Sequence, residues 1–312
     1  MTTQLSAEYH WQLLPASMVS NPAPEIWICS LKAPVAEIAG NKWLKLQSAL
    51  QQRQPGQGIL SFGGAFSNHL AALAAAGHHY NFPTIGIVRT DHLDRQNPTL
   101  KRCQAFGMQL KALNRDSYRQ HQQTEFLNSL KISYPHYLIV PEGGSDQAGA
   151  WGVRTLPLQQ TPAGAADLLC CATASGGTLA GIIHQHPTIR CLGLAVVKDS
   201  SLPQRVNACL PSDEIFNNWS IAQARSGYGK LSADLIAFCC QLKREYNIST
   251  EPVYTGKALH LLIELITKGA LANVKRVAFF HTGGLQGLHG LHYRQRLTAE
   301  QYQLLAAESA TI

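Results

Sequence analysis

Short apolar runs alternate with helical patterns through most of the chain from residue 58 onward. The first series contains the runs GILSF, TIGIVR, QLKAL and HYLIVP, separated by stretches with helical periodicity. A second series contains DLLCCAT, CLGLAVV and RVAFF, again with helical stretches between them. A strand followed by a helix, repeated along the chain, is typical of a parallel sheet covered by helices on both faces. The sequence therefore predicts an α/β protein with two doubly wound parallel-sheet lobes.

The break between the two series falls in the glycine-rich segment GGSDQAGAWG, residues 143–152. Glycines loosen the chain at this point. We expect a large domain formed by residues 1–46 and 148–312, and a small domain formed by residues 47–147. Ligands of such folds bind at the carboxyl ends of the strands, which predicts a site in the cleft between the lobes.

The composition favours a globular protein of the cytoplasm. The chain has 312 residues and is 45% hydrophobic, enough to bury sizeable cores. Its start lacks a basic segment followed by an apolar run, and its longest apolar stretches are too short to span a bilayer. The eight cysteines show no CxxC spacing, and two adjacent pairs lie within apolar runs. We expect these thiols to be reduced and to pack in the cores.

The charge pattern argues against nucleic acid as a partner. The formal net charge is +7, but the 26 lysines and arginines are scattered and no aromatic and basic stripe is present. A mildly basic pocket for small anions explains the excess more simply. No convincing metal-ligand spacing occurs, so no catalytic metal is expected.

Three glycine-rich turns follow predicted strands. SFGGAFSNH places Ser67 and Asn68 at the start of an alanine-rich helix, CATASGGTLAG opens the helix after residue 177, and FFHTGGLQG supplies Thr282. Glycines let backbone N–H groups approach an anion, and a helix N-terminus adds partial positive charge. The second turn is therefore a candidate phosphate cradle, although an isolated loop of this kind is more often a plain strand-to-helix connection.

The segment GNKWLKL carries two lysines three residues apart, Lys42 and Lys45, in apolar company. Residues at this spacing share one helix face, so the two amines can serve a single small ligand. For an isolated pair, solvated lysines at a helix start would be the simpler explanation.

Seven motifs together resemble one known family. GNKWLKL, GGAFSNH, EGGSD, ASGGTLAG, GYG, EPVYTGKA and HTGG occur in the order and approximate spacing of the 1-aminocyclopropane-1-carboxylate deaminase and D-cysteine desulfhydrase family, from about residue 38 to 290. That family belongs to the tryptophan-synthase-β-like, fold-type II enzymes, which use pyridoxal 5′-phosphate. The resemblance implies that this cofactor binds in the cleft between the lobes.

The resemblance also implies residue roles. Lys42 would form the Schiff base and Lys45 would contact the cofactor phosphate, as would the turn at 174–178. Asn68 would bond to the phenolic oxygen of the cofactor. The implied cofactor-binding residues are Lys42, Lys45, Asn68, Ala174, Ser175, Gly176, Gly177, Thr178, Thr255 and Thr282. The implied catalytic residues are Lys42, Ser67, Tyr254 and Tyr228.

Two threonines favour one branch of the family. Ring-opening deaminases of the family carry a glutamate after the motif tyrosine and a leucine before the late Gly-Gly, whereas this chain has Thr255 and Thr282. A neutral hydroxyl near the pyridine nitrogen gives a weaker electron sink. This favours D-cysteine desulfhydrase-like β-elimination of a small amino acid to a 2-oxo acid and ammonia.

Two alternatives stay open. One is 1-aminocyclopropane-1-carboxylate deaminase activity. The other is a catalytically degenerate pyridoxal-phosphate-binding protein, suggested because WICSLKAPVAEIAGNK lacks the acidic pair that family members carry there. Phe66 also replaces the Gln or Tyr that often precedes the motif serine, and Trp151 is expected in a core. The resemblance further implies a homodimer, a small amino-acid substrate and no membrane partner.

Overall fold

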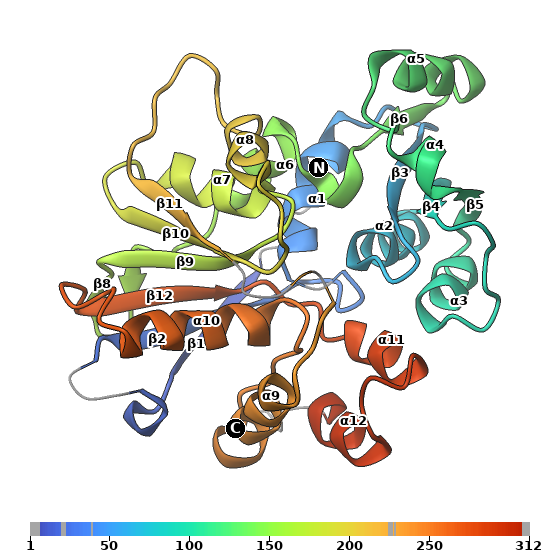
Figure 1. Ribbon diagram of the computed structural model, residues 1–312. Coiled ribbons are helices and arrows are strands. Elements are labelled where there is room, and N and C mark those ends of the chain that lie inside the picture. Colours follow the sequence, from blue (N-terminus) through green and yellow to red (C-terminus); the bar gives the residue numbers. More distant parts are fainter. Residues whose placement is uncertain (1–6, 20–22, 39, 224–226, 228, 308–312) are drawn as a thin grey trace.

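The computed structural model describes residues 7–19, 23–38, 40–223, 227 and 229–307, and contains two separate parallel-sheet lobes (Figure 1). Each lobe holds one main sheet with helices packed against it. The predicted α/β class and the two doubly wound lobes are confirmed.

The large lobe contains a six-stranded sheet of order β1-β2-β12-β9-β10-β11. Its strands are β1 (Glu8–Leu13), β2 (Glu25–Lys32), β9 (Leu168–Thr173), β10 (Arg190–Ala195), β11 (Trp219–Ala222) and β12 (Arg276–His281). All neighbours pair in parallel except β1, which runs antiparallel to β2 at one edge. A short hairpin of β7 (Gln160–Thr161) and β8 (Gly164–Ala165) stands apart from this sheet.

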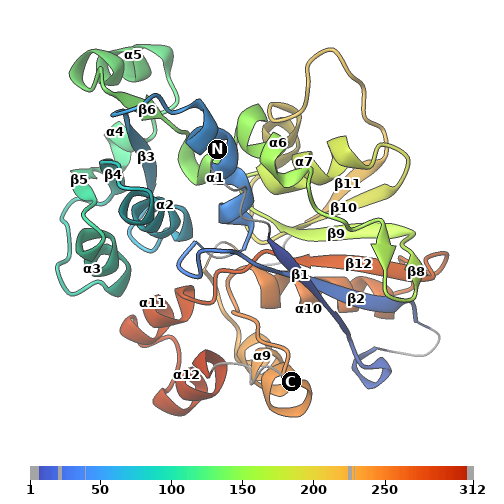
Figure 2. The ribbon, with the colours of Figure 1, turned by 180° about the vertical axis from the view of Figure 1, so that it is seen from behind.

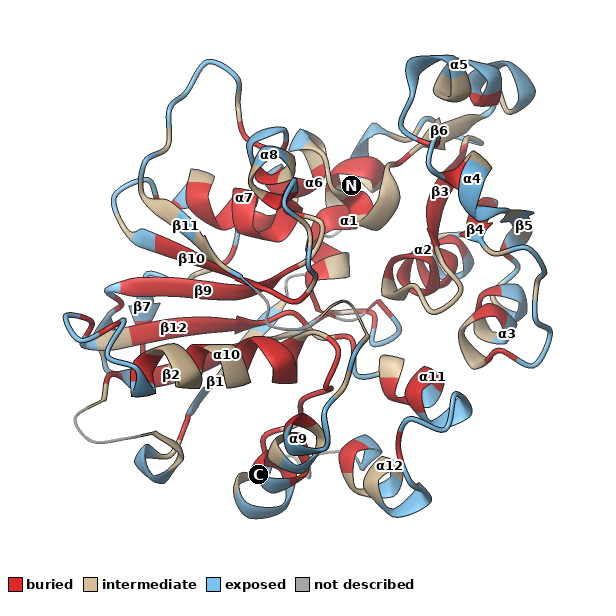
Figure 3. Ribbon diagram, in the orientation of Figure 1, coloured by how far each residue is buried: buried red, intermediate tan, exposed pale blue. Residues whose placement is uncertain are grey.

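Both faces of the large sheet are covered, which explains its near-continuous apolar strands. In β9, Leu168 and Cys170 pack toward α10 (Thr255–Thr267), whereas Leu169 and Cys171 pack toward α7 (Gly177–Gln185). The alternation follows from the two-residue period of a strand. Figure 3 shows β9 as a buried ribbon along its whole length, and β12 is buried from Val277 onward.

The small lobe contains a four-stranded parallel sheet of order β5-β4-β3-β6. Its strands are β3 (Gly58–Gly64), β4 (Thr84–Arg89), β5 (Gln109–Leu113) and β6 (Tyr137–Ile139). The alanine-rich helix α2 (Asn68–His79) covers one face, and α4 (Arg115–Tyr118) and α5 (Thr124–Ser133) supply side chains to the other.

The remaining helices connect the lobes or extend the large one, except α3 (Pro98–Ala105), which packs on α2 and β5 in the small lobe. They are α1 (Asn41–Gln52), α3, α6 (Gln147–Val153), α8 (Leu202–Asn207), α9 (Ala233–Tyr246), α11 (Gly287–Tyr293) and α12 (Ala299–Ala306), with 3-10 turns η1 (Ala16–Met18) and η2 (Glu142–Gly144). In both views α11 and α12 lie beneath the small lobe, and α11 contacts α3 (Figures 1 and 2).

Some local expectations differ from the structure. The helical stretch between QLKAL and HYLIVP is two helices, α4 and α5, because the polar segment RQHQQ between them forms turns. Trp151 is not in a core: it is 59% exposed on α6, with the Arg154 guanidinium 3.7 Å from its ring centre.

All eight cysteines are buried and unpaired, as expected of thiols that pack as small apolar groups. Cys170 and Cys171 point to opposite faces of β9, so the adjacent pair serves two different cores. The two main sheets draw on residues 8–32 with 168–281 and on residues 58–139. The finer domain boundaries at 46 and 148 stay a prediction.

Candidate active site

A cavity of roughly 580 Å³ lies at the carboxyl ends of the strands, between the two lobes. It is lined by the loops that follow β3, β9 and β12 and by the start of α1. These are the positions where parallel α/β sheets bind ligands, because loops from neighbouring strands meet there.

Gly40 fixes the start of α1 against the loop after β12. Its φ is +62°, and a Cβ at this position would lie 2.2 Å from the carbonyl oxygen of Thr282. The same carbonyl accepts a hydrogen bond from the Asn41 backbone N–H at 3.1 Å. Only glycine allows this approach, so the backbone of α1 enters the cavity in one fixed position.

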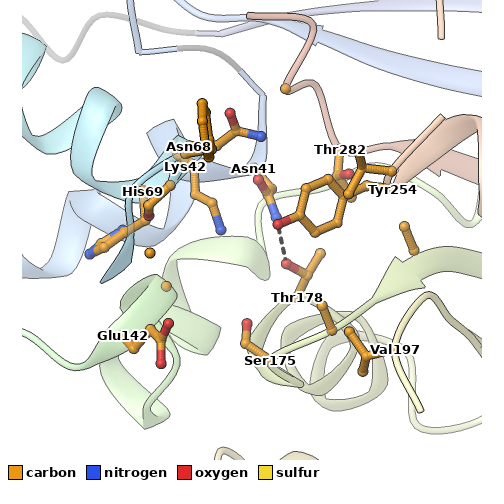
Figure 4. Close-up of a pocket in the computed structure, with 18 of the residues that line it drawn as sticks. Asn41, Lys42, Asn68, His69, Glu142, Ser175, Thr178, Val197, Tyr254 and Thr282 are labelled. Carbon is orange, nitrogen blue, oxygen red and sulfur yellow. Dashed lines mark hydrogen bonds between the residues drawn. The ribbon is translucent and has the colours of Figure 1, made fainter. Parts of the chain in front are cut away.

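Lys42 follows at the second position of α1, and its amine points into the cavity (Figure 4). Burial lowers the pKa of Lys42 to about 8, and the nearby negative charge of Glu142 opposes that shift. A lysine with a lowered pKa has a larger fraction of free amine at neutral pH, which is the form that attacks a carbonyl.

The turn between β9 and α7 forms a cradle opposite this amine. Gly176, with φ +94°, is the N-cap of α7, and a Cβ there would lie 3.0 Å from the Val206 backbone nitrogen. The hydroxyl of Thr178 accepts a hydrogen bond from the Asn41 amide at 2.9 Å, drawn as a dashed line in Figure 4. The first N–H groups of a helix have no partner within the helix, and its N-terminus carries partial positive charge, so this turn suits an anion.

Most of the predicted cofactor side chains meet around this space. The described cavity lining includes Lys42, Asn68, Ala174, Ser175, Gly176, Thr178 and Thr282. Ser67 and Tyr254, predicted as catalytic, also line it. Gly177, at the first position of α7, is not in the lining, and a Cβ there would lie 3.0 Å from Cε of Lys45. Tyr228 lies outside the described residues.

Lys45 lies behind the cradle rather than in the cavity lining. It is 2% exposed, and its ammonium donates to the Gly143 carbonyl at 2.7 Å and to the Ser145 hydroxyl at 2.6 Å. Ser145 in turn donates to the Ser175 hydroxyl at 2.6 Å. Burial holds the pKa of Lys45 well below its usual range, and the charge of Lys42 adds to the effect. Lys45 is therefore linked to the cradle through two hydroxyls, and its predicted contact with the cofactor phosphate stays a prediction.

Thr255 also lies outside the cavity lining, because its hydroxyl bonds to Glu251. The Glu251 carboxylate is 1% exposed and accepts backbone hydrogen bonds from Val253, Tyr254 and Thr255 at 2.8–2.9 Å. Burial raises the pKa of Glu251 to about 7 despite these bonds. This carboxylate caps the start of α10 and fixes the backbone of Tyr254 beside the cavity.

Several charged residues of the lining were not predicted from the sequence. They are Glu142, Arg89, Arg115, Arg205 and Arg294. Glu142 belongs to the EGGSD motif, so its proximity to the cradle could have been inferred from that motif. The arginines come from four distant segments, and no local pattern indicates that they share a cavity.

His69 is a further unpredicted lining residue. Its Nε2 lies 2.8 Å from the Ser61 hydroxyl, and burial lowers the pKa of His69 well below its usual range. The imidazole is therefore neutral and adds no charge to the cavity. Among the described residues, no group of three or more His, Cys, Asp or Glu side chains is placed to hold a metal ion. Within the same residues, no helix is long and apolar enough to cross a bilayer.

The two sides of the cavity make complementary demands on a ligand. A free amine reacts with an aldehyde, and a glycine-lined helix N-terminus binds a phosphate. A small phosphorylated aldehyde meets both requirements. Pyridoxal phosphate is such an aldehyde, so the cavity has the features of an enzyme that uses this cofactor.

The sequence profile of the family described as "Pyridoxal-phosphate dependent enzyme" matches residues 37–283, and the chain belongs to this family. The cofactor of this enzyme is therefore pyridoxal phosphate. The residues present fit it, since the cradle is closed to a Cβ at Gly176 and faces the amine of Lys42.

Individual relatives have related names. The chain is 27% identical to the bifunctional D-cysteine desulfhydrase/1-aminocyclopropane-1-carboxylate deaminase of Arabidopsis thaliana mitochondria, over 85% of this chain and 73% of that protein. It is 24% identical to a D-cysteine desulfhydrase of Klebsiella pneumoniae, over 82% and 85% respectively. The crystal structure of an ACC deaminase homologue superposes with a TM-score of 0.71 at 22% identity, over 96% and 94% of the two chains.

Proposed function

We propose that this enzyme is a lyase that converts a small amino acid to a 2-oxo acid and ammonia by β-elimination, in the manner of a D-cysteine desulfhydrase. The observation that carries the proposal is the amine of Lys42 facing the cradle across one cavity, with Ser67 and Tyr254 on its walls. The names of two relatives include this activity.

When bound, pyridoxal phosphate withdraws electrons from the α-carbon of the amino acid and makes its proton acidic. Residues 174–178 would hold the phosphate, and Asn68 would bond to the phenolic oxygen. Lys42 would hold the cofactor and, once displaced by substrate, accept the α-proton. Its lowered pKa suits this role, because a base works best when its pKa lies near the working pH.

Ser67 and Tyr254 would supply hydroxyls for proton transfer near the reacting carbons. Ser67 is the N-cap of α2 and accepts a hydrogen bond from the Leu70 N–H at 3.2 Å, so its position is fixed. Tyr254 is fixed by Glu251 through its backbone N–H. Both hydroxyls are therefore carried on backbone that does not need to reorganise during the reaction.

Thr282 supports β-elimination over ring opening. It is 8% exposed and lines the cavity, whereas the hydroxyl of Thr255 is turned to Glu251. The argument for a weak electron sink therefore depends on Thr282 alone. A weak sink suits substrates with a good leaving group at the β-carbon.

The alternative is a 1-aminocyclopropane-1-carboxylate deaminase, because relatives carry that name as well. The test is to load the purified protein with pyridoxal phosphate and assay 2-oxo acid and ammonia from each candidate substrate. Pyruvate from D-cysteine supports the proposal, and 2-oxobutyrate from aminocyclopropane carboxylate supports the alternative. A protein that binds the cofactor but converts neither these substrates nor cysteine, serine and their enantiomers would be a degenerate binding protein.

We further propose a homodimer and a cytoplasmic location. Eight buried, unpaired thiols suit a reducing compartment, which supports the cytoplasmic location.

The homodimer is suggested by an aromatic surface. The exposed Trp151 lies next to His184, whose ring contacts Phe216, and this surface suits a contact between two copies. Light scattering should give a molar mass of twice that of one chain. The Trp151→Glu variant should have the molar mass of a single chain.

A further inference from the structure

Two arginines lie side by side at the exposed edge of the cavity. Arg89 is the last residue of β4, and Arg115 begins α4 two residues after β5 ends. The two strands are parallel neighbours, with Arg89 paired opposite Leu113. Both side chains line the cavity, and both are exposed. Parallel pairing thus brings two cations to the same edge of the small sheet.

A third cation faces the cavity from the other lobe. Arg294 is the C-cap of α11, its guanidinium carbon lies 4.4 Å from the centre of the Phe66 ring, and its Nε donates to the Gly290 carbonyl. We call Arg89, Arg115 and Arg294 the rim of the cavity.

Two of the rim arginines, Arg89 and Arg115, lack balancing negative charge among the described residues. Glu142 is the only carboxylate of the cavity lining among the described residues. Within that part of the chain, neither Arg89 nor Arg115 has a carboxylate oxygen within ion-pair distance. Arg205 differs, because it is paired with Asp199 at 3.0 Å. Neighbouring cations without counter-charges favour the binding of an anion between them.

The cofactor and an ordinary amino acid leave the rim unused. The cradle provides backbone donors for the phosphate of the cofactor, and the start of α2 provides neutral donors for one carboxylate. A substrate whose only anionic group is the α-carboxylate therefore has no group for Arg89 and Arg115 to bind.

We propose that the substrate is a small amino acid whose side chain carries a second anionic group, and that Arg89 and Arg115 bind this group. The inference rests on the proposed lyase function and names its substrate class. Where the anionic group is a phosphate ester, it also supplies a leaving group. With O-phosphoserine, the Cα–H proton passes to Lys42 and the Cβ–O bond breaks with its electron pair leaving on phosphate. Water then completes the conversion to pyruvate and ammonia.

The first experiment compares O-phosphoserine with D-cysteine, each as both enantiomers, on the cofactor-loaded enzyme. Arg89→Gln and Arg115→Gln should each raise KM for O-phosphoserine about fivefold to tenfold, as loss of one partly screened charge would do, with a smaller change for cysteine. The rise in KM with added salt should be steeper for O-phosphoserine.

Arg119→Gln is the matched control. Arg119 lies four residues from Arg115, is 79% exposed at its side chain and pairs with Asp116 outside the cavity. Arg119→Gln removes the same charge from the opposite end of the same short helix and should change neither KM. Equal effects of the Arg115 and Arg119 variants would overturn the proposal.

A binding measurement separates this inference from the lyase proposal. Succinate should raise the melting temperature more than butyrate does, and Arg115→Gln should abolish the difference. D- and L-aspartate, as inhibitors, report whether a carboxylate is accepted as well as a phosphate ester. If succinate binds selectively but no amino acid is converted, the lyase proposal fails and the anion site stands. If cysteine is converted but neither succinate nor O-phosphoserine is preferred, the anion site is wrong.

Discussion

The floor and the rim of the cavity differ in how their residues are held. The floor, which we define as Asn41, Lys42, residues 174–178 and Thr282, is largely buried and joined by short backbone and side-chain hydrogen bonds. The rim consists of exposed arginines whose positions come from strand and helix ends. The hydrogen-bonded floor suits a chemistry that is common to a whole family. The exposed rim allows a change of substrate without a change in that chemistry.

Removal of the floor amine should have the largest effect. Lys42→Ala should lower the rate of 2-oxo acid release about 10³-fold or more, because it removes both the covalent hold on the cofactor and the proton acceptor. The yellow absorbance of the bound cofactor should also be lost. Lys32→Ala is the control, because Lys32 is exposed, pairs with Glu8 and is not in the cavity lining. Activity within tenfold of wild type would remove Lys42 from the mechanism.

Replacement of Gly40, which closely approaches the Thr282 carbonyl, should have the next largest effect. Gly40→Ala should destabilise the protein by about 3–5 kcal/mol, the sum of a disfavoured backbone conformation and a clash with the Thr282 carbonyl. Gly56→Ala is the matched control: its φ is +75°, but nothing lies within 4 Å of the added Cβ. It should cost only about 1–2 kcal/mol. Urea unfolding measures the free energy of unfolding of both variants. Equal losses of stability would show that α1 is not fixed by this contact.

The buried amine should make the protein without cofactor less stable below pH 8. The pKa of Lys42 is lowered to about 8 from 10.5, so between these values the unfolded chain binds more protons. Stability should therefore rise as the pH increases from about 8 to 10.5. Lys42→Met should be more stable than wild type at pH 7, and its advantage should shrink across that window. An advantage independent of pH would mean that the amine is not desolvated.

A hydrogen bond between α11 and the small lobe, next to the rim residue Arg294, should have the smallest effect. Tyr293 on α11 donates to the Asp94 carboxylate of the small lobe at 2.7 Å, and the bond is exposed. Tyr293→Phe should reduce the unfolding free energy by less than about 1 kcal/mol, since water replaces the lost partner. A loss above about 2 kcal/mol would show that α11, which carries Arg294 at its end, is held on the small lobe as firmly as the floor is held.

The sequence predicted the sheets and most of the floor, because those features are local. Apolar runs buried on both faces, such as LLCCAT, are continuous in the sequence, and glycine-rich turns follow them directly. The antiparallel edge strand β1 and the short strand β11 were not predicted, since neither is fully buried and each alternates weakly.

The rim was not predictable in the same way. Arg89, Arg115 and Arg294 span about two thirds of the chain, and only strand register and the packing of α11 bring them to one cavity. The positions of Lys45 and Thr255 show a related limit. Their spacing from Lys42 and Tyr254 is visible in the sequence, but their hydrogen-bond partners Ser145 and Glu251 decide which way the side chains turn.

A single buried apolar cluster runs through both lobes. It includes Ile59 and Leu73 of the small lobe, Leu46 of α1, and Leu179 and Phe280 of the large lobe. Cutting the chain between the sheets would expose this interior on both fragments, so neither half is expected to fold on its own. Heating should accordingly melt the two halves in one calorimetric transition rather than in sequence.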